Sequence, residues 1–397
     1  MNLLTLIKIS WRNIWRNKLR SLVVIFSIVF GLLGGIIIIA MSYGLNEERM
    51  NNAVDTYLSH IQIHNILFSE DYNIKHTINN LDIIEKAINE DERVVSYSKR
   101  IVLNGMLSNS NGSYGIQVKG VDPEEEVKVT NTYEKIIDGQ YFKSKRDNTI
   151  IVGKKLADKL NLNLKSKVVI TFQDENYELT SLLYRVEGIF RSGNSRYDEM
   201  NVFVKNKSIT KNLPGFNGYH EMPILLSDIE LRGEVKKDLI PISSDNIVEG
   251  WDDISKELAY ANEMLSAVLY IFMMIILSGL SFGVVNTMLM AILERRKEIG
   301  MLMSIGMNRY KIFMMISFET IFLSLIALPF GLLTSYMIVD YYSVVGIDLS
   351  VVEAGLENFG VGTRLYFKVP NEEYFNVSLM VFCYLYFFFN IPIYKST

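Results

Sequence analysis

The chain has 397 residues, 49% of them apolar, and a mean hydropathy of +0.17. These values exclude a disordered chain, a collagen-like repeat and a small disulfide scaffold. Its 40 basic and 44 acidic residues leave a net charge of −4, which argues against a nucleic-acid binder. The single cysteine, Cys383, excludes an internal disulfide and a cysteine-based metal site.

Four long apolar stretches dominate the pattern. Each is long enough to cross a hydrocarbon core that needs about 20 helical residues. We predict membrane spans at residues 21–46, 263–293, 312–339 and 374–394. A cleaved signal peptide is the alternative for the first stretch, but the apolar region of a signal peptide is about 7–15 residues long and this run continues further.

Basic residues set the orientation of these spans. The N-terminal segment 1–20 carries Lys8, Arg12, Arg16, Lys18 and Arg20 and no acidic residue, which places it in the cytoplasm. The segment 294–311 is also rich in basic residues and fits a cytoplasmic loop. The chain is therefore predicted to be an α-helical membrane protein with four transmembrane helices, both termini inside. Residues 47–262 form a large α/β extracytoplasmic domain between the first and second spans, 340–373 an outer loop, and 395–397 a cytoplasmic tail.

The extracytoplasmic segment mixes strand and helix patterns. Alternation of apolar and polar residues predicts strands at 60–64, 114–121, 148–153, 167–172, 182–190 and 200–205. Apolar spacings of three and four predict helices at 81–90 and 153–162. Helical patterns also lead out of the first span over 45–58 and, from 253 to 265, directly into the second.

No catalytic or metal site is predicted in this segment. His60 and His64 share a strand, and no further ligand accompanies them. The acidic run Asp122, Glu124, Glu125 and Glu126 is interpreted as a solvated loop in which Pro123 opens a turn. Gly153-Lys154 lacks the other residues of a phosphate-binding loop, and neither HExxH nor CxxC occurs. The chain is not expected to bind ATP itself.

The cytoplasmic stretch LERRKEIGMLMSIGMNRYKI, residues 293–312, is the most informative. Charged residues end the second span, Gly300 interrupts the pattern, and Met301, Leu302 and Ile305 supply an apolar face. The pattern predicts a short amphipathic helix at the membrane surface. Two interpretations remain open: a plain loop whose arginines set the topology, and a helix that docks a soluble partner.

Within the spans, small residues are spaced for close helix packing. Gly31 and Gly35 in the first span, and Gly279 and Gly283 in the second, each form a small-xxx-small step. Packing within the chain and contact with a second chain are both possible uses. Glu319 is an isolated carboxylate near the start of the third span, and we expect it to face protein, in a structural hydrogen bond rather than a proton relay.

Residues 294–333, ERRKEIGMLMSIGMNRYKIFMMISFETIFLSLIALPFGLL, resemble the signature of FtsX-type permease domains. ISWRNIWRNKLRSLVVIFSIVFG (9–31) is similar to the start of the LolC, LolE and MacB permeases. GQYFKSKRDNTIIVGKKLADKLNLNLKSKVVITF and YRVEGIFRSG resemble their periplasmic core domain. At one turn the chain has Leu164-Lys165-Ser166-Lys167 where relatives usually have Gly-Asp.

This resemblance implies a permease subunit of a type VII (MacB-fold) ABC transporter in the bacterial inner membrane. It would work as a homo- or heterodimer with two copies of a separate ATPase, which would hold ATP and magnesium; this chain would hold no cofactor. Its other partners would be membrane lipids and a lipoprotein or other periplasmic substrate, not nucleic acid. The family motif implies ATPase contact through a coupling helix that contains Glu294, Arg295, Arg296, Lys297, Glu298, Gly300, Met301, Ile305 and Gly306.

Three functions fit the resemblance. Release of lipoproteins, as by LolC and LolE, fits the opening sequence and the size of the outer domain. MacB-like efflux of periplasmic peptides or drugs and FtsX-like signalling to a cell-wall hydrolase are the alternatives. Relatives continue past the proline that corresponds to Pro392 with a short basic segment. An extension of the chain beyond Thr397 is therefore expected to raise coupled ATPase activity.

Overall fold

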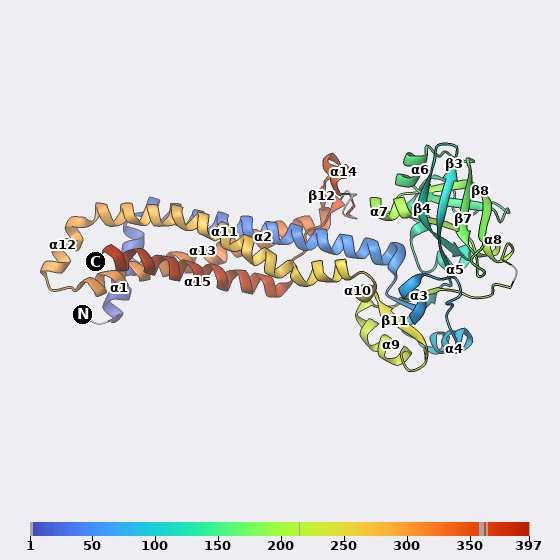
Figure 1. Ribbon diagram of the computed structural model, residues 1–397. Coiled ribbons are helices and arrows are strands. Elements are labelled where there is room, and N and C mark those ends of the chain that lie inside the picture. Colours follow the sequence, from blue (N-terminus) through green and yellow to red (C-terminus); the bar gives the residue numbers. More distant parts are fainter. Residues whose placement is uncertain (1–2, 214, 357–360, 363, 397) are drawn as a thin grey trace. The chain divides into compact units, whose positions relative to one another are not determined.

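The computed structural model describes residues 3–213, 215–356, 361–362 and 364–396, and it divides into two compact units. The helical unit comprises Met1–Asn46, Asn262–Asp348 and Arg364–Thr397. The α/β unit comprises Glu47–Ala261 and Leu349–Thr363. Figure 1 shows the elements of both units along the chain.

The helical unit is built from long helices. They are α1 (Leu3–Arg16), α2 (Lys18–Ala53), α11 (Lys256–Glu294), α12 (Arg296–Ser304), α13 (Arg309–Val345) and α15 (Asn371–Ser396), with a small strand pair, β12 (Ile347–Asp348) and β13 (Arg364–Leu365). Helices α2 and α11 each continue into the α/β unit.

Three helical segments among the described residues are long and apolar enough to cross a membrane. They are Lys18–Leu58, Lys256–Glu294 and Arg309–Val345, and they contain the first three predicted spans. The predicted fourth span, 374–394, lies within α15, but its side chains from 385 onward lie outside those the structure describes. Thr397 also lies outside the described residues. The predicted count of four spans thus stays a prediction.

Glycines let α2 approach its neighbours in this unit. An added Cβ at Gly31 would overlap Leu280 of α11, and one at Gly35 would overlap Met273. Gly279 and Gly283, the other pair singled out by spacing, differ: an added Cβ on either would meet none of the described atoms within 4 Å. The spacing is the same in both helices, but only the α2 pair faces another helix of the described chain.

The α/β unit contains a four-stranded antiparallel sheet in the order β11-β1-β10-β2. Its strands are β1 (Ile61–Asn65), β2 (Val94–Tyr97), β10 (Glu221–Leu226) and β11 (Asn246–Gly250). Helices α4 (Leu81–Glu90) and α9 (Arg232–Leu239) bury their apolar stripes against it, through Ile84 and Ile88 of α4 and Val235 and Leu239 of α9.

The second sheet of this unit closes on itself. Its order is β5-β8-β6-β9-β4-β3-β7, and β7 also pairs with β8. The strands are β3 (Ile101–Asn109), β4 (Gly112–Val121), β5 (Ile136–Gly139), β6 (Thr149–Gly153), β7 (Lys167–Gln173), β8 (Leu179–Phe190) and β9 (Asn201–Lys205). Alternate residues of these strands fill the interior of the barrel, which is the largest apolar core of the unit.

Short elements connect the strands of this unit. They are the π-helix η1 (Val54–Leu58), the 3₁₀ segments η2 (Thr132–Lys135) and η3 (Ile229–Leu231), and the helices α3 (Ile66–Asp71), α5 (Pro123–Glu126), α6 (Lys154–Leu160), α7 (Ser195–Met200), α8 (Asn206–Thr210) and α10 (Trp251–Ile254). Two further short elements, η4 (Ser350–Val352) and α14 (Glu353–Leu356), lie between β12 and β13.

The structure confirms the six predicted strands as β1, β4, β6, β7, β8 and β9 to within a few residues, and it confirms the helix at 81–90 as α4. The helix predicted over 253–265 is confirmed from Lys256 onward, where α11 runs into the second span, but its start differs because the chain leaves the helical conformation at Ser255. Asp253 accepts a hydrogen bond from the Gly250 backbone N–H at 2.9 Å, and this cap creates the separate short helix α10.

The departure from the Gly-Asp turn has a visible consequence. Lys165 adopts a positive φ of 68°, the left-handed conformation that glycine accepts without strain. Its backbone N–H donates to the Val186 carbonyl at 2.8 Å, which holds the turn against β8. The turn therefore keeps a conformation that favours glycine although a lysine occupies it.

The prediction that the acidic run is a solvated loop is wrong for one of its members. Glu126, at the end of α5, is fully buried. Its carboxylate accepts two hydrogen bonds from Arg100, at 2.5 and 3.1 Å, and further ones from Ser98 at 2.7 Å and Thr130 at 3.0 Å. A buried carboxylate needs such partners because desolvation alone disfavours its charge.

Arg100 joins three elements around this carboxylate. Besides Glu126 of α5, it bonds the backbone oxygen of Tyr57 in η1 at 3.1 Å and lies 3.4 Å from Glu221 of β10. Lys119 of β4 completes the group at 3.9 Å from Glu221. We call Arg100, Lys119, Glu126 and Glu221 the buried charge cluster; it connects the four-stranded sheet to the barrel.

Neighbouring cations lower the pKa values of the two carboxylates in this cluster. Burial alone would raise the pKa of Glu221, but the charges of Lys119, Arg100 and His64 outweigh burial and lower that pKa to about 2. Burial likewise opposes ionisation of Glu126, and its bonds and attraction to Arg100 again lower the pKa. Both carboxylates thus stay ionised at neutral pH, each beside a cation.

Candidate functional site

The predicted amphipathic helix is present as α12, between α11 and α13. Ile299 and Leu302 turn inward and pack on an apolar cluster formed by Leu6, Met307, Ile312, Met315 and Ile316. That cluster belongs to α1, to the turn after α12 and to α13. The inner face of α12 is therefore fixed to its own chain.

The outer face of α12 has the opposite character. Met301 is 59% exposed and Ile305, directly after the helix, is 79% exposed. Met301 lies on the helix and Ile305 at its end, and residues four positions apart share one face of a helix. Together they form an apolar surface that the described part of the chain leaves exposed. Arg296, Lys297 and Gly300 are exposed as well.

The two glycines of the motif, Gly300 and Gly306, have different structural roles. Gly300 was expected to interrupt the helix, but it lies inside α12, and a Cβ added there would meet none of the described atoms within 4 Å. The helix ends at Ser304, and Gly306 two residues later turns the chain with a φ of +94°, which is strained for any other residue. Its backbone N–H donates to Met303 and that of Met307 donates to Leu302, which closes the last turn.

The charged residues of the motif pair with their own chain. Glu294 bonds Arg20 of α2, and Glu298 lies 2.5 Å from Arg16 of α1. Arg295 reaches Glu319 of α13 at 3.4 Å. The hydrogen bond from Arg16 lowers the pKa of Glu298. Three of the residues expected to contact a partner thus connect α12 and the end of α11 to three other helices.

Glu319 lies at the centre of this arrangement. Its Oε1 accepts a hydrogen bond from the Asn13 side chain at 2.6 Å and faces the Arg295 guanidinium. A cavity of about 340 Å³ opens beside it, lined by residues of α1, α11, α12 and α13. A carboxylate in a membrane helix is stable when paired in this way.

Sequence reasoning missed the contribution of α1. Residues 1–20 were interpreted only as a basic segment, yet Leu3–Arg16 form a helix that packs along α13. Ser10 donates to the Met315 backbone oxygen at 2.8 Å, and Leu6 and Ile14 are buried. The signal was available: Leu6, Ser10, Asn13 and Ile14 recur at spacings of three and four among charged residues.

Comparisons with known proteins point to one family. The chain is 23% identical over 350 residues to the lipoprotein-releasing system transmembrane protein LolC of Buchnera aphidicola, covering 83% of this chain and 82% of LolC. It is 19% identical to LolE of Haemophilus influenzae over 76% of this chain and 74% of LolE. It is 26% identical to an uncharacterized ABC transporter permease of Methanocaldococcus jannaschii over 84% of each chain.

The FtsX-like permease C-terminal family matches residues 270–396, which include α12 and Glu319. The chain thus resembles ABC transporter permeases of the FtsX type. The permease also aligns with the solved periplasmic region of MacB from Actinobacillus actinomycetemcomitans, at 12% identity and a TM-score of 0.36, over 53% of this chain and 97% of that one. The extracellular domain of YknZ aligns at 16% identity and a TM-score of 0.33, over 48% of this chain and all of that one.

Among the described residues, no group of three or more His, Cys, Asp or Glu side chains is arranged to hold a metal ion. Of the four histidines, His64 is buried beside Glu249, and His60 accepts a hydrogen bond from the Leu226 backbone N–H. The features of the helical unit that stand out chemically are the exposed apolar surface of α12 and the charged pairs behind it.

Proposed function

We propose that this permease is the membrane subunit of a lipoprotein-releasing ABC transporter in the bacterial inner membrane. It would couple ATP hydrolysis on a separate ATPase to motion of the α/β unit outside the membrane. LolC and LolE, named as lipoprotein-releasing transmembrane proteins, are similar to it over most of its length, which supports this choice. The proposed complex holds two copies of the ATPase and a second permease chain.

The observation that carries the proposal is the two-sided construction of α12. Met301 and Ile305 are exposed and apolar, as an anchor for a soluble partner would be. On the other side, Arg16, Arg20 and Glu319 bind the charged residues at the start of the motif. A partner that moves α12 must therefore also pull on α1, α2 and α13.

Such an arrangement transmits motion only if the ATPase contacts α12 differently in its open and closed states. In the proposal, closure of the ATPase dimer on ATP and magnesium shifts α12, and α2 and α11 carry the shift outward. Both helices cross the boundary between the helical unit and the α/β unit in the sequence. The proposed topology has the N-terminus and α12 in the cytoplasm.

The test begins with gentle purification of the permease from its native membrane and mass spectrometry of the proteins that accompany it. ATPase activity of the complex is then measured for two variants. Ile305→Glu places a charge on the exposed apolar surface, and Glu298→Lys reverses the pairing with Arg16. We expect both to insert and fold normally, Ile305→Glu to lose the bound ATPase, and Glu298→Lys to keep it but lose the stimulation of hydrolysis.

Matched controls separate docking from general damage. Ile305→Leu keeps the surface apolar and should behave as the parent. Val351→Glu places the same charge on a residue that is 96% exposed in the α/β unit and should leave the ATPase bound. An unaltered ATPase response in both test variants would remove α12 as the coupling element. Acylated lipoproteins in the purified complex support release, whereas an adaptor and an outer-membrane channel would replace release by efflux.

A further inference from the structure

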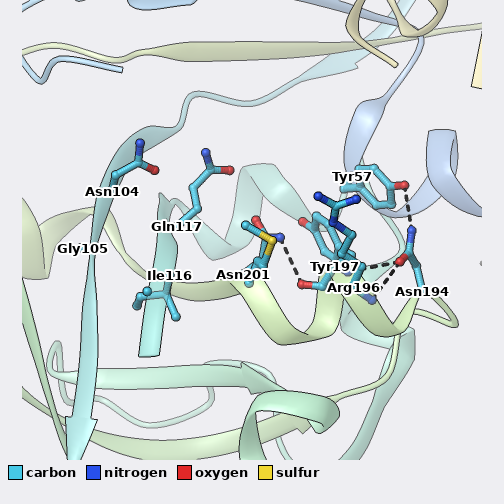
Figure 2. Close-up of a pocket in the computed structure, with 11 residues that line it drawn as sticks. Tyr57, Asn104, Gly105, Ile116, Gln117, Asn194, Arg196, Tyr197 and Asn201 are labelled. Atoms are coloured by element: carbon cyan, nitrogen blue, oxygen red, sulfur yellow. Dashed lines mark hydrogen bonds between the residues drawn. The ribbon is translucent and has the colours of Figure 1, made fainter. Parts of the chain in front are cut away.

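A cavity of about 570 Å³ lies in the α/β unit. One wall is the face of β3 and β4, where Asn104 and Gln117 are directly paired across the strands. The other wall is Tyr57 of η1 together with residues 194–201, which form α7 and the start of β9. Figure 2 shows Asn104 and Gln117 on one side and Tyr57, Arg196 and Asn194 on the other, with Asn201 between them. The size is that of sites that bind small ligands or short segments.

Two residues that line this cavity each carry a buried side-chain oxygen with no partner among the described residues. They are Tyr197, which is 9% exposed, through its hydroxyl, and Asn201, which is 7% exposed, through Oδ1. The amide of Asn201 is fixed, because its Nδ2 donates to the Tyr197 backbone oxygen at 3.0 Å. Because both oxygens are buried behind the surface of the cavity, a ligand there meets the more exposed side chains of Asn104, Gln117 and Arg196.

The lining groups define the chemistry of that ligand. Asn104, Gln117 and Asn201 each combine a donor and an acceptor, as a peptide group does. Arg196, an exposed side chain, is the one charged residue among those that line the cavity, and no acidic residue is among them. A ligand rich in amides that carries a carboxylate matches both features.

The aromatic rings argue against a sugar as the ligand. Tyr57 stacks on Tyr197 with ring centroids 4.2 Å apart, so one face of Tyr197 is covered. Lys119 lies over the Tyr197 ring at 5.5 Å, and since no side chain fits between the stacked rings it covers the other face. The platform that a sugar ring would need on Tyr197 is thus occupied.

We propose that this cavity binds a short extended peptide segment with an acidic side chain, whose amides pair with Asn104 and Gln117 and whose carboxylate pairs with Arg196. Gly115, in the wall formed by β4, leaves room for the segment. On the proposed function, the peptide segment would belong to a periplasmic cargo or carrier protein. Peptide binding itself does not depend on the ATPase, so failure of this test leaves the proposed function intact.

The experiment uses the full chain in lipid nanodiscs and a fluorescent hexapeptide, Ac-Ala-Ser-Glu-Ala-Ser-Ala-NH₂, with binding followed by polarisation. The same peptide with Lys in place of Glu should bind at least tenfold more weakly. Gly115→Phe should reduce binding at least tenfold by filling the cavity. An added Cβ at Gly115 meets none of the described atoms within 4 Å and its φ is not positive, so this change should not disturb the fold.

Gly233→Phe is the matched control, because Gly233 lies in α9, outside the cavity, and is equally open. It should bind the peptide as the parent does. Asn104→Ala/Gln117→Ala, which removes two amides without filling the cavity, should also weaken binding. The proposal is overturned if the two peptides bind equally, if Gly115→Phe binds like Gly233→Phe, or if chitotriose binds at the cavity and neither peptide does.

Discussion

Arginine–glutamate pairs occur in both units of the permease, in opposite surroundings. Arg100 and Glu126 in the α/β unit are 1% and 0% exposed, and hydroxyls of Ser98 and Thr130 satisfy the carboxylate further. Arg16 and Glu298 in the helical unit are each about half exposed, and these two residues meet at a similar distance. The distance between the charges is thus no guide to what a pair contributes.

Desolvation makes the difference. Two charges in water attract weakly and are screened by salt, so an exposed pair holds its elements loosely. Buried charges interact strongly, but removal of one partner leaves the other without water or a counter-ion. We infer that the buried charge cluster fixes the joint between the sheet and the barrel, whereas the exposed Arg16–Glu298 pair can break and re-form as α12 moves.

The substitution Arg100→Met tests the buried side of this comparison and should have the largest effect. It leaves Glu126 buried without a cation and Tyr57 without its donor, at a cost of about 3–5 kcal/mol in unfolding free energy. Hydrogen exchange of the β4 and β10 amides in the full chain measures this loss. The double variant Arg100→Met/Glu126→Leu removes both charges and should recover much of the stability. A single variant as stable as the parent would contradict the inference.

Acidification should open the α/β unit before the helical unit. The His220 Nε2 bonds the Ile74 backbone oxygen at 2.9 Å, and its Nδ1 accepts from the Val102 N–H at 3.0 Å, so the ring is held neutral. Burial lowers the pKa of His220 from 6.5 to about 4. As the pH falls between these values, only the unfolded state takes up the proton, and folding loses about 3 kcal/mol in total.

The helical unit provides the control for this titration. All four histidines lie in the α/β unit, so the helical unit has none. The pKa of Glu298 is lowered by its bond to Arg16, so this pair keeps its contribution above the ordinary glutamate value of 4.5 and loses it only below. Hydrogen-exchange protection factors, which remove the pH dependence of the intrinsic exchange rate, should therefore fall between pH 7 and pH 5 in β3 and β10 and not in α12. An equal fall of the protection factors in both units would contradict the comparison.

Apolar stretches and periodic patterns in the sequence predicted much of the fold. The three helices that are long and apolar enough to cross a membrane follow from uncharged apolar stretches. The helix α4 and six strands follow from patterns that repeat every 3.6 or two residues, because one face of each is buried. The strands β2, β3, β5, β10 and β11 were not predicted. Strands β2 and β5 are only four residues long, too short for the pattern to stand out.

Contacts between residues far apart in the chain could not be predicted from the sequence. Glu126 follows three other acidic residues and was taken as solvated, because only Arg100, 26 positions away, makes its burial favourable. The motif predicted α12 but not the residues that bind it, since Asn13, Arg16 and Arg20 are some 270 to 310 positions away from their partners. Gly31 and Gly279 have the same spacing, and only the fold distinguishes their surroundings.

The substitution Arg16→Ala tests the exposed side of the comparison and should have the smallest effect on stability. Both partners keep contact with water, so loss of the pair leaves neither charge stranded, and the unfolding midpoint should match that of the parent. Exchange of the α12 amides should rise, because α12 has lost a connection to α1. Salt at 0.5 M should produce the same local rise in the parent and none in the variant. Arg49→Ala, which removes the pair with Glu257 in the α/β unit, is the matched control and should leave α12 unchanged. If Arg16→Ala destabilises the whole permease as Arg100→Met does, the Arg16–Glu298 pair is a fixed part of the fold, and it cannot act as a contact that yields when α12 moves.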